Sequence, residues 1–133
     1  MQLIQTIAMG LTLTAAIAAS APPTIKLDLL PLHGSRERGT ATLTPRGTGL
    51  IISIEVVGAG SGATQFAHFH RGTCEHIESP AVYELQPVRN GRSTTTLETV
   101  SLDSLIHGTY SILIHKTLSH TSPHVACGTV AGA

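Results

Sequence analysis

The sequence contains no tryptophan and only two phenylalanines and two tyrosines among its 133 residues. Hydrophobic residues still make up 41% of the chain, which is too many for a disordered protein. The 13 glycines exclude a continuous coiled coil. A chain of this length fits one ordinary domain and is too short for two enzyme domains.

Charge is scarce as well. Charged residues make up 12% of the chain, and eight basic residues balance eight acidic ones, so the formal net charge is zero with neutral histidine. Binding of nucleic acid through bulk charge needs a clustered cationic surface. The composition therefore argues against a nucleic-acid partner. Histidine, in contrast, is abundant, with 8 residues.

The first 21 residues carry no charged side chain. An apolar stretch runs from about Ile7 to Ala19, and Ala16-Ile17-Ala18 has the small-x-small pattern of a signal-peptide cleavage site. We expect residues 1–18 to be a signal peptide and residues 19–133 to be one domain that is secreted, extracellular or periplasmic. No basic residue precedes the apolar stretch, so an uncleaved membrane anchor is the alternative. Because polar residues dilute the stretch, we expect no stable membrane association after cleavage.

The chain has two cysteines, Cys74 and Cys127. In an oxidising compartment the two are free to pair, and we expect a disulfide between them. Closing a loop of about fifty residues would stabilise the fold by roughly 4 kcal/mol. Two separately buried thiols are the alternative.

Short runs rich in valine, isoleucine, leucine and threonine recur between glycines, prolines and asparagines. Their near-regular spacing predicts an all-β fold, an antiparallel sandwich or barrel of about eight short strands. Asn90-Gly91 predicts a tight hairpin turn, and Ser101–Ile106 is the one predicted helical turn, with Ser101 as its N-cap. The expected strands are Thr24–Leu30, Gly39–Thr44, Gly49–Val57, Thr64–His70, Ala81–Pro87, Ser93–Val100, Gly108–His115 and Val125–Val130.

The sharpest chemical feature is His68-Phe69-His70. Residues two apart in a strand project from the same side, so both imidazoles should face one way and Phe69 the core. Two imidazoles on one pleated face form a bidentate site for copper or zinc. Cys74, if bridged, would fix the loop beside this pair. The alternative is two exposed polar residues of a strand.

His115 ends the apolar run Ile112-Leu113-Ile114. It is either an exposed residue at the end of a strand or a third ligand that meets His68 and His70 across the fold. Three neutral imidazoles would leave one coordination position open for a substrate.

The other histidines are weaker candidates. His76 is a possible fourth metal ligand through the Cys74 loop, or else a solvated loop residue. His120 and His124 are candidates for the rim of the site and for a proton donor, with an exposed loop as the alternative. His33 and His107 lie next to glycines at expected turns, and we do not expect them to be ligands.

At these residues the sequence resembles the copper/zinc superoxide dismutase family. His68-Phe69-His70 followed by Cys74 is similar to the family's copper-binding His-x-His pair and its first disulfide cysteine. Ser111–Lys116 resembles the strand with the last copper histidine, and Val125–Val130 the C-terminal strand whose cysteine closes the bridge. The resemblance runs from about Thr24 to the end. It implies an antiparallel, immunoglobulin-like Greek-key β-sandwich or barrel.

The resemblance also implies a function. One copper ion would be held by His68, His70 and His115, which would be the catalytic residues of an oxidoreductase that disproportionates superoxide to oxygen and hydrogen peroxide. In the family a long loop after the first cysteine carries a histidine that bridges copper and zinc, together with the other zinc ligands. In this chain the segment from Cys74 to Pro80 is short, so we expect copper without zinc.

Two functions of different classes follow from the sequence. The first is an exported copper enzyme that acts on superoxide, with weaker attraction of the anion because His124 stands where the family has an arginine. The second is a non-enzymatic exported β-sandwich that sequesters copper ions or has a structural role. The fold alone does not decide between them, because function resides in the site.

Overall fold

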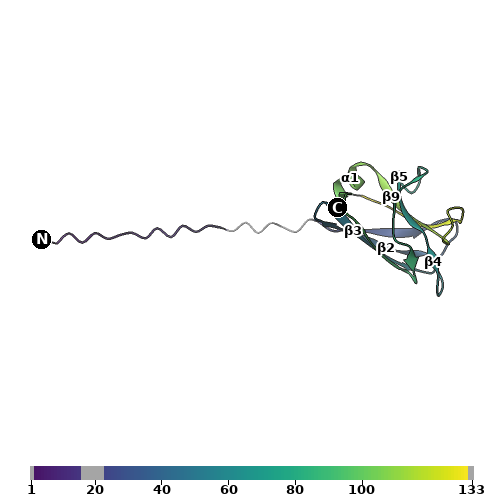
Figure 1. Cartoon of the computed structure of the whole chain (residues 1–133), viewed down its shortest axis with the longest axis horizontal. Coiled ribbons are helices and arrows are strands. Elements are labelled where there is room, and N and C mark those ends of the chain that lie inside the picture. The colour runs from purple at the N-terminus through teal and green to yellow at the C-terminus, as the bar shows by residue number, and fades with distance from the viewer. Residues whose placement is uncertain (1, 16–22, 132–133) are drawn as a thin grey trace.

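The computed structural model describes residues 2–15 and 23–131. In this part of the chain ten strands form one antiparallel sheet that curls into a half-barrel, with one short helix (Figure 1). The predicted all-β class is therefore confirmed. The elements are β1 (Ile25–Pro31), β2 (Arg38–Arg46), β3 (Gly49–Val57), β4 (Thr64–Gln65), β5 (Ala67–Arg71), β6 (Ala81–Glu84), β7 (Val88–Arg89), β8 (Arg92–Leu97), α1 (Leu102–His107), β9 (Tyr110–His115) and β10 (His124–Thr129).

Residues 2–15 contain no helix or strand, and their side chains are exposed. Among the described residues, no helix is long and apolar enough to cross a membrane. The cleavage site predicted at Ala16-Ile17-Ala18, and the mature end at Ala19, lie outside the described residues. The signal peptide remains a prediction.

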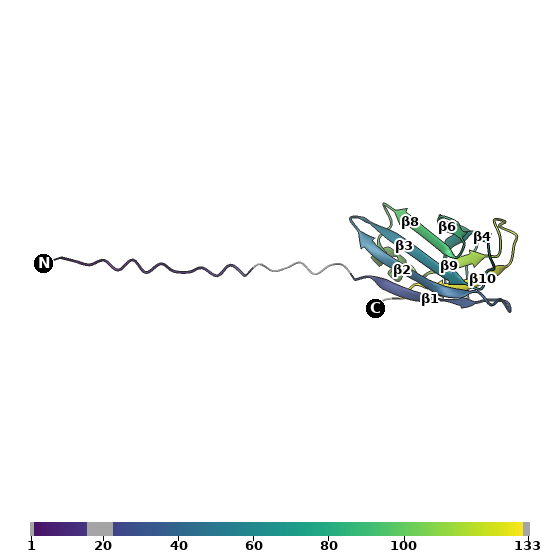
Figure 2. The same cartoon turned by 90° about the horizontal axis from the view of Figure 1, so that it is seen from below.

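The order of the strands brings distant segments of the chain together. β1, β2 and β3 are neighbours in sequence order, and β3 then pairs with β8 while β1 pairs with β10 (Figure 2). β9 lies between β10 and β5. The strand that contains His68 and His70 therefore adjoins the strand that ends at His115. The full order is β4-β7-β8-β3-β2-β1-β10-β9-β5-β6.

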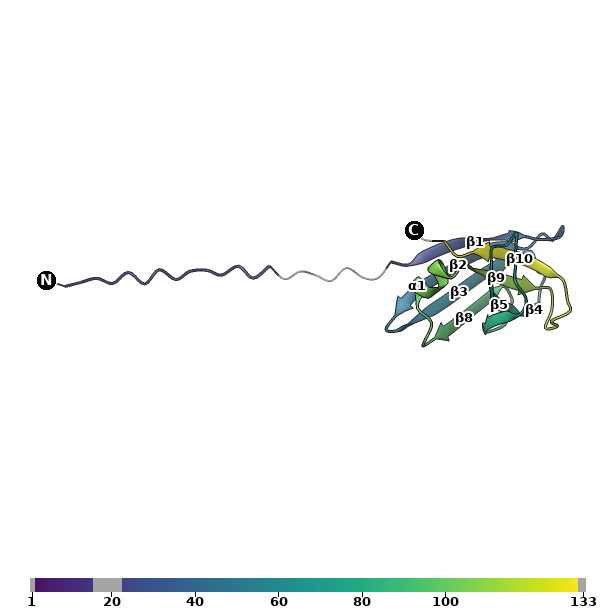
Figure 3. The ribbon, with the colours of Figure 1, turned by 90° about the horizontal axis from the view of Figure 1, so that it is seen from above.

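Alternation of apolar and polar residues explains how the strands face the core. In β3 the burial of successive side chains follows the predicted period of two, with the buried face formed by Leu50, Ile52, Ile54 and Val56. Burying one such aliphatic side chain contributes about 1.5–3 kcal/mol. Leu102 and Leu105 of α1 add to the same core at the end opposite the loop between β9 and β10 (Figure 3).

Two local predictions are confirmed. Asn90 and Gly91 have φ angles of 49° and 80° and form the turn between β7 and β8. Positive φ at both positions matches the twist of the flanking strands. Ser101 caps α1, since its side chain accepts a hydrogen bond from the backbone N–H of Ser104.

Two predicted strands are interrupted. The strand expected over Ala81–Pro87 ends at Glu84, because Pro87 has no N–H for a strand ladder and the N–H of Gln86 bonds to the Thr95 hydroxyl at 2.8 Å. The strand expected over Thr64–His70 is broken at Phe66, whose N–H bonds to the carbonyl of Thr117. At this break the chain passes from pairing with β7 to pairing with β9.

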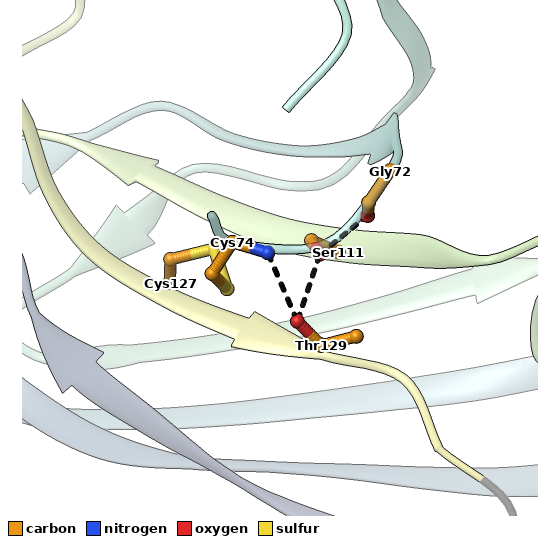
Figure 4. The surroundings of a disulfide bond; sticks show 5 residues. All are labelled: Gly72, Cys74, Ser111, Cys127 and Thr129. Carbon is orange, nitrogen blue, oxygen red and sulfur yellow. Dashed lines mark hydrogen bonds between the residues drawn. A yellow bond between two sulfur atoms is a disulfide. The ribbon is translucent and has the colours of Figure 1, made fainter. Parts of the chain in front are cut away.

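The predicted disulfide is present between Cys74 and Cys127, which are 53 positions apart. It joins the loop after β5 to β10 (Figure 4). In the same region the N–H of Cys74 bonds to the Thr129 hydroxyl at 3.0 Å, and the Ser111 hydroxyl bonds to the carbonyl of Gly72 at 2.7 Å. The loop is therefore fixed by covalent and polar links together. A disulfide is compatible with an oxidising compartment.

Candidate metal centre

β5 divides its side chains between two faces, as predicted. Phe69 is completely buried in the core cluster. His68 and His70 are only 2% and 8% exposed, and both line a cavity of about 700 Å³. Burial of two imidazoles on one face excludes the alternative of two exposed strand residues.

His115 lies at the end of β9 and lines the same cavity. Its ring centroid is 5.3 Å from that of His68, and the centroids of His68 and His70 are 6.0 Å apart. Imidazoles that bind one ion at about 2.0–2.1 Å have ring centroids roughly 5–6 Å apart. The structure therefore brings together, at near-ligand spacing, the three histidines singled out from the sequence.

Backbone carbonyls orient two of these rings. Nδ1 of His70 lies 3.0 Å from the carbonyl oxygen of Glu78, and Nδ1 of His115 lies 3.2 Å from that of Ser122. A carbonyl only accepts, so each Nδ1 carries the proton and donates it. Each Nε2 then keeps a lone pair, which is the arrangement found in metal-binding histidines.

Several ring nitrogens are buried without a partner. Neither nitrogen of His68 nor Nε2 of His70 has a hydrogen-bond partner among the described residues. The nearest carboxylate, on exposed Glu84, is 3.8 Å from His68 Nε2. A buried polar atom without a partner is costly, and a metal ion bound by these imidazoles would remove this cost for one nitrogen of each ring. The donor set fits copper or zinc, both of which imidazole suits.

Burial also keeps the imidazoles neutral. It lowers the pKa of His68 from 6.5 to about 4, with further lowering by His115 and His70. Burial likewise lowers the pKa of His115 and the pKa of His124. These rings are therefore neutral at pH 7, which is the form that binds metal.

The rings lie close together but do not form a complete metal site. In the described part of the chain, no group of three or more His, Cys, Asp or Glu side chains forms a ready-made metal site. The planes of His68 and His115 stand at 87°, and those of His68 and His70 at 78°. Because no such group is formed, binding of one ion would require these side chains to move closer to a common point.

The weaker candidates separate into two groups. His120 and His124 line the cavity. His76 is exposed in the turn after Cys74 and is not among the cavity-lining residues, so the structure does not bring it to the other rings. His33 and His107 are exposed and are not among the residues that line this cavity, although His33 lines a second cavity together with His124.

Sequence reasoning did not single out Gln65 or Phe66. Gln65 is completely buried and donates from Nε2 to Glu37 Oε2 at 2.6 Å and to the carbonyl of His115 at 3.0 Å. It thereby fixes the backbone at His115. Its position two residues before Ala67, on the core-facing side of the same segment, was a usable signal for burial. Phe66 stacks against His120, with ring centroids 4.6 Å apart.

Comparison of the chain with protein-family models, curated proteins and solved structures finds no match.

Proposed function

We propose that the protein is an exported copper-binding protein in which His68, His70 and His115 hold one copper ion. The observation that carries this proposal is the meeting of three buried imidazoles from two adjacent strands at one open cavity, with ring nitrogens that lack other partners. Imidazole suits both copper and zinc, and Cu(II) has the higher affinity for a given site among first-row divalent ions.

We further propose that the chain is a divergent, copper-only relative of the superoxide dismutases with a Greek-key barrel. The strand order supports this topology, because β10 lies beside β1 and β8 beside β3, each joined by a connection that is not a simple hairpin. The positions of His68, His70, Cys74, His115 and Cys127 support the family.

In this proposal the protein disproportionates superoxide. A bound copper ion would supply one-electron chemistry between Cu(II) and Cu(I), so that one superoxide is oxidised to oxygen and a second, with two protons, is reduced to hydrogen peroxide. His68, His70 and His115 hold the site, and the open cavity admits the small anion.

One observation favours a second candidate, copper sequestration without turnover. Among the described residues that line the cavity there is no lysine or arginine to attract an anion. A cationic cleft raises the association rate of an anionic substrate, so turnover by this site would be slower than with such a residue.

Pulse radiolysis separates the two candidates. We expect copper-loaded protein to accelerate the decay of superoxide, and His115→Ala to lose the acceleration while keeping its fold. Tight copper binding with unchanged superoxide decay would overturn the enzyme and leave sequestration. Export is tested separately by N-terminal sequencing of the protein released from cells, which we expect to begin at Ala19.

A further inference from the structure

β10 enters the candidate metal centre through a β-bulge. His124 pairs with His115, whereas Ala126 pairs with Ile114, so Val125 is the extra residue. Val125 and Ala126 both belong to the core cluster, although consecutive residues of a regular strand face opposite sides. The bulge therefore moves His124 by one position and sets it opposite His115. Bulges often re-aim a side chain next to an active site.

The result is a closed circuit of four rings. The centroid distances are 6.0 Å from His70 to His68, 5.3 Å from His68 to His115, 4.6 Å from His115 to His124, and 6.4 Å from His124 back to His70. All four rings line the same cavity. Each of the four rings therefore has two of the other three as neighbours.

His120, the fifth imidazole of the cavity, is placed differently. Its ring lies nearly parallel to that of Phe66 at 4.6 Å and to that of His68 at 5.3 Å, with an interplanar angle of 21° in both cases. A ring stacked on the face of His68 lies beside that ring and not across the centre from it. His120 is also exposed, whereas His124 is half-buried.

We propose that His124 is a fourth metal ligand, so that His68, His70, His115 and His124 together hold the ion. This inference rests on the proposed copper site and adds to it a ligand from a third strand. Four imidazole nitrogens are a donor set that suits Cu(II) in tetragonal geometry. With β5, β9 and β10 each contributing a ligand, ion binding would tie the start of β10 to β9 beside it and to β5 on the far side of β9.

Electron paramagnetic resonance of the Cu(II)-loaded protein tests this ligand directly, because ligand nitrogens split the copper signal and can be counted. We expect four nitrogens in the wild type and three in His124→Ala, with the copper affinity lowered at least tenfold in a competition titration. His120→Ala is the matched control, since it removes an imidazole of the same cavity. It should keep four nitrogens and lose less than threefold in affinity.

Failure of this inference differs from failure of the copper site. A four-nitrogen signal that persists in His124→Ala and in the size-conserving His124→Gln overturns the fourth ligand, as does a wild type with three nitrogens. If His68→Ala and His115→Ala leave copper binding unchanged, the proposed site itself is wrong. The unfolding transition of each metal-free variant shows whether it folds, and His124→Gln serves if His124→Ala does not.

Discussion

The ring of His115 lies 5.3 Å from the ring of His68 on the neighbouring strand. The register of β5 and β9 accounts for this proximity: Ala67 pairs with Ile114, and the N–H of His115 bonds to the carbonyl of Phe66 at 2.9 Å. His68 and His115 are thus diagonal neighbours on one face of an antiparallel pair, within reach of each other's side chains. The candidate site depends on this register, because a one-residue slip would turn one imidazole to the other face.

Removing one imidazole of this pair should weaken copper binding. We expect His68→Ala and His115→Ala each to lower Cu(II) affinity at least tenfold, measured by calorimetric titration of metal-free protein. Removing a residue that hydrogen-bonds to a metal ligand typically lowers metal affinity about 10–100-fold, and removing the ligand itself should lower the affinity at least as much. His107→Ala, which removes an exposed imidazole of α1, is the control and should bind as the wild type does. Equal affinity in all four proteins would contradict the assignment.

The stability of the metal-free protein should fall with acid. The unfolded chain protonates His68 near pH 6.5, whereas burial lowers the pKa of this residue to about 4 in the folded protein. Between these values the unfolded state binds more protons. The contribution of neutral His68 to the free energy of unfolding is therefore complete above pH 6.5. It is lost as the pH falls toward 4, and the loss is no more than about 3 kcal/mol. Burial shifts the pKa of His115 and the pKa of His124 in the same direction.

Urea unfolding at a series of pH values measures this effect. We expect His68→Gln to flatten the decline in the free energy of unfolding between pH 6.5 and 4, and His107→Gln to leave it as in the wild type. A wild-type free energy that stays constant over this range would show that the folded protein protonates these rings as readily as the unfolded chain does.

The disulfide should contribute strongly to stability. Replacing both cysteines, Cys74→Ser with Cys127→Ser, should lower the free energy of unfolding by about 2–5 kcal/mol, because the unfolded chain regains the entropy of a 53-residue loop. Urea denaturation of wild type and double variant gives the difference. The wild type with added reductant should unfold at the same midpoint as the double variant. An unchanged midpoint under reducing conditions would mean that the bridge adds nothing.

The buried pair of Gln65 and Glu37 offers a double-mutant cycle. Gln65→Leu leaves the Glu37 carboxylate, which is 7% exposed, without its donor at 2.6 Å, and should cost about 1–3 kcal/mol or more. Gln65→Leu combined with Glu37→Leu should recover part of this loss, since both partners are then apolar. Thermal unfolding measures the four proteins. Additive losses in the double variant would show that the two side chains act independently.

Local patterns in the sequence predicted much of the fold. Period-two alternation gave the buried face of β3 and the opposed faces of His68 and Phe69. The preference of Asn-Gly for tight turns predicted the turn at Asn90-Gly91, and the preference of serine for the N-cap predicted that Ser101 begins the helix. Each of these features depends on residues that are close in sequence, which is why the residues alone sufficed.

Features that depend on the pairing of distant strands were not predictable in the same way. The bulge at Val125 sets His124 opposite His115, and nothing in the sequence of β10 marks it. The exposed turn that contains His76 is likewise held by a long-range link, the disulfide between Cys74 and Cys127. Alternation was a usable signal that Gln65 faces the core, although it was not used, but nothing marked Glu37 as the partner of Gln65.

Anomalous X-ray diffraction from a crystal soaked in Cu(II), recorded at the copper absorption edge, tests the central claim most directly. We expect one strong peak in the cavity, at about 2.0–2.1 Å from a ring nitrogen of each of His68, His70 and His115. An ion bound elsewhere, or one in contact with fewer than two of these three rings, would contradict the account.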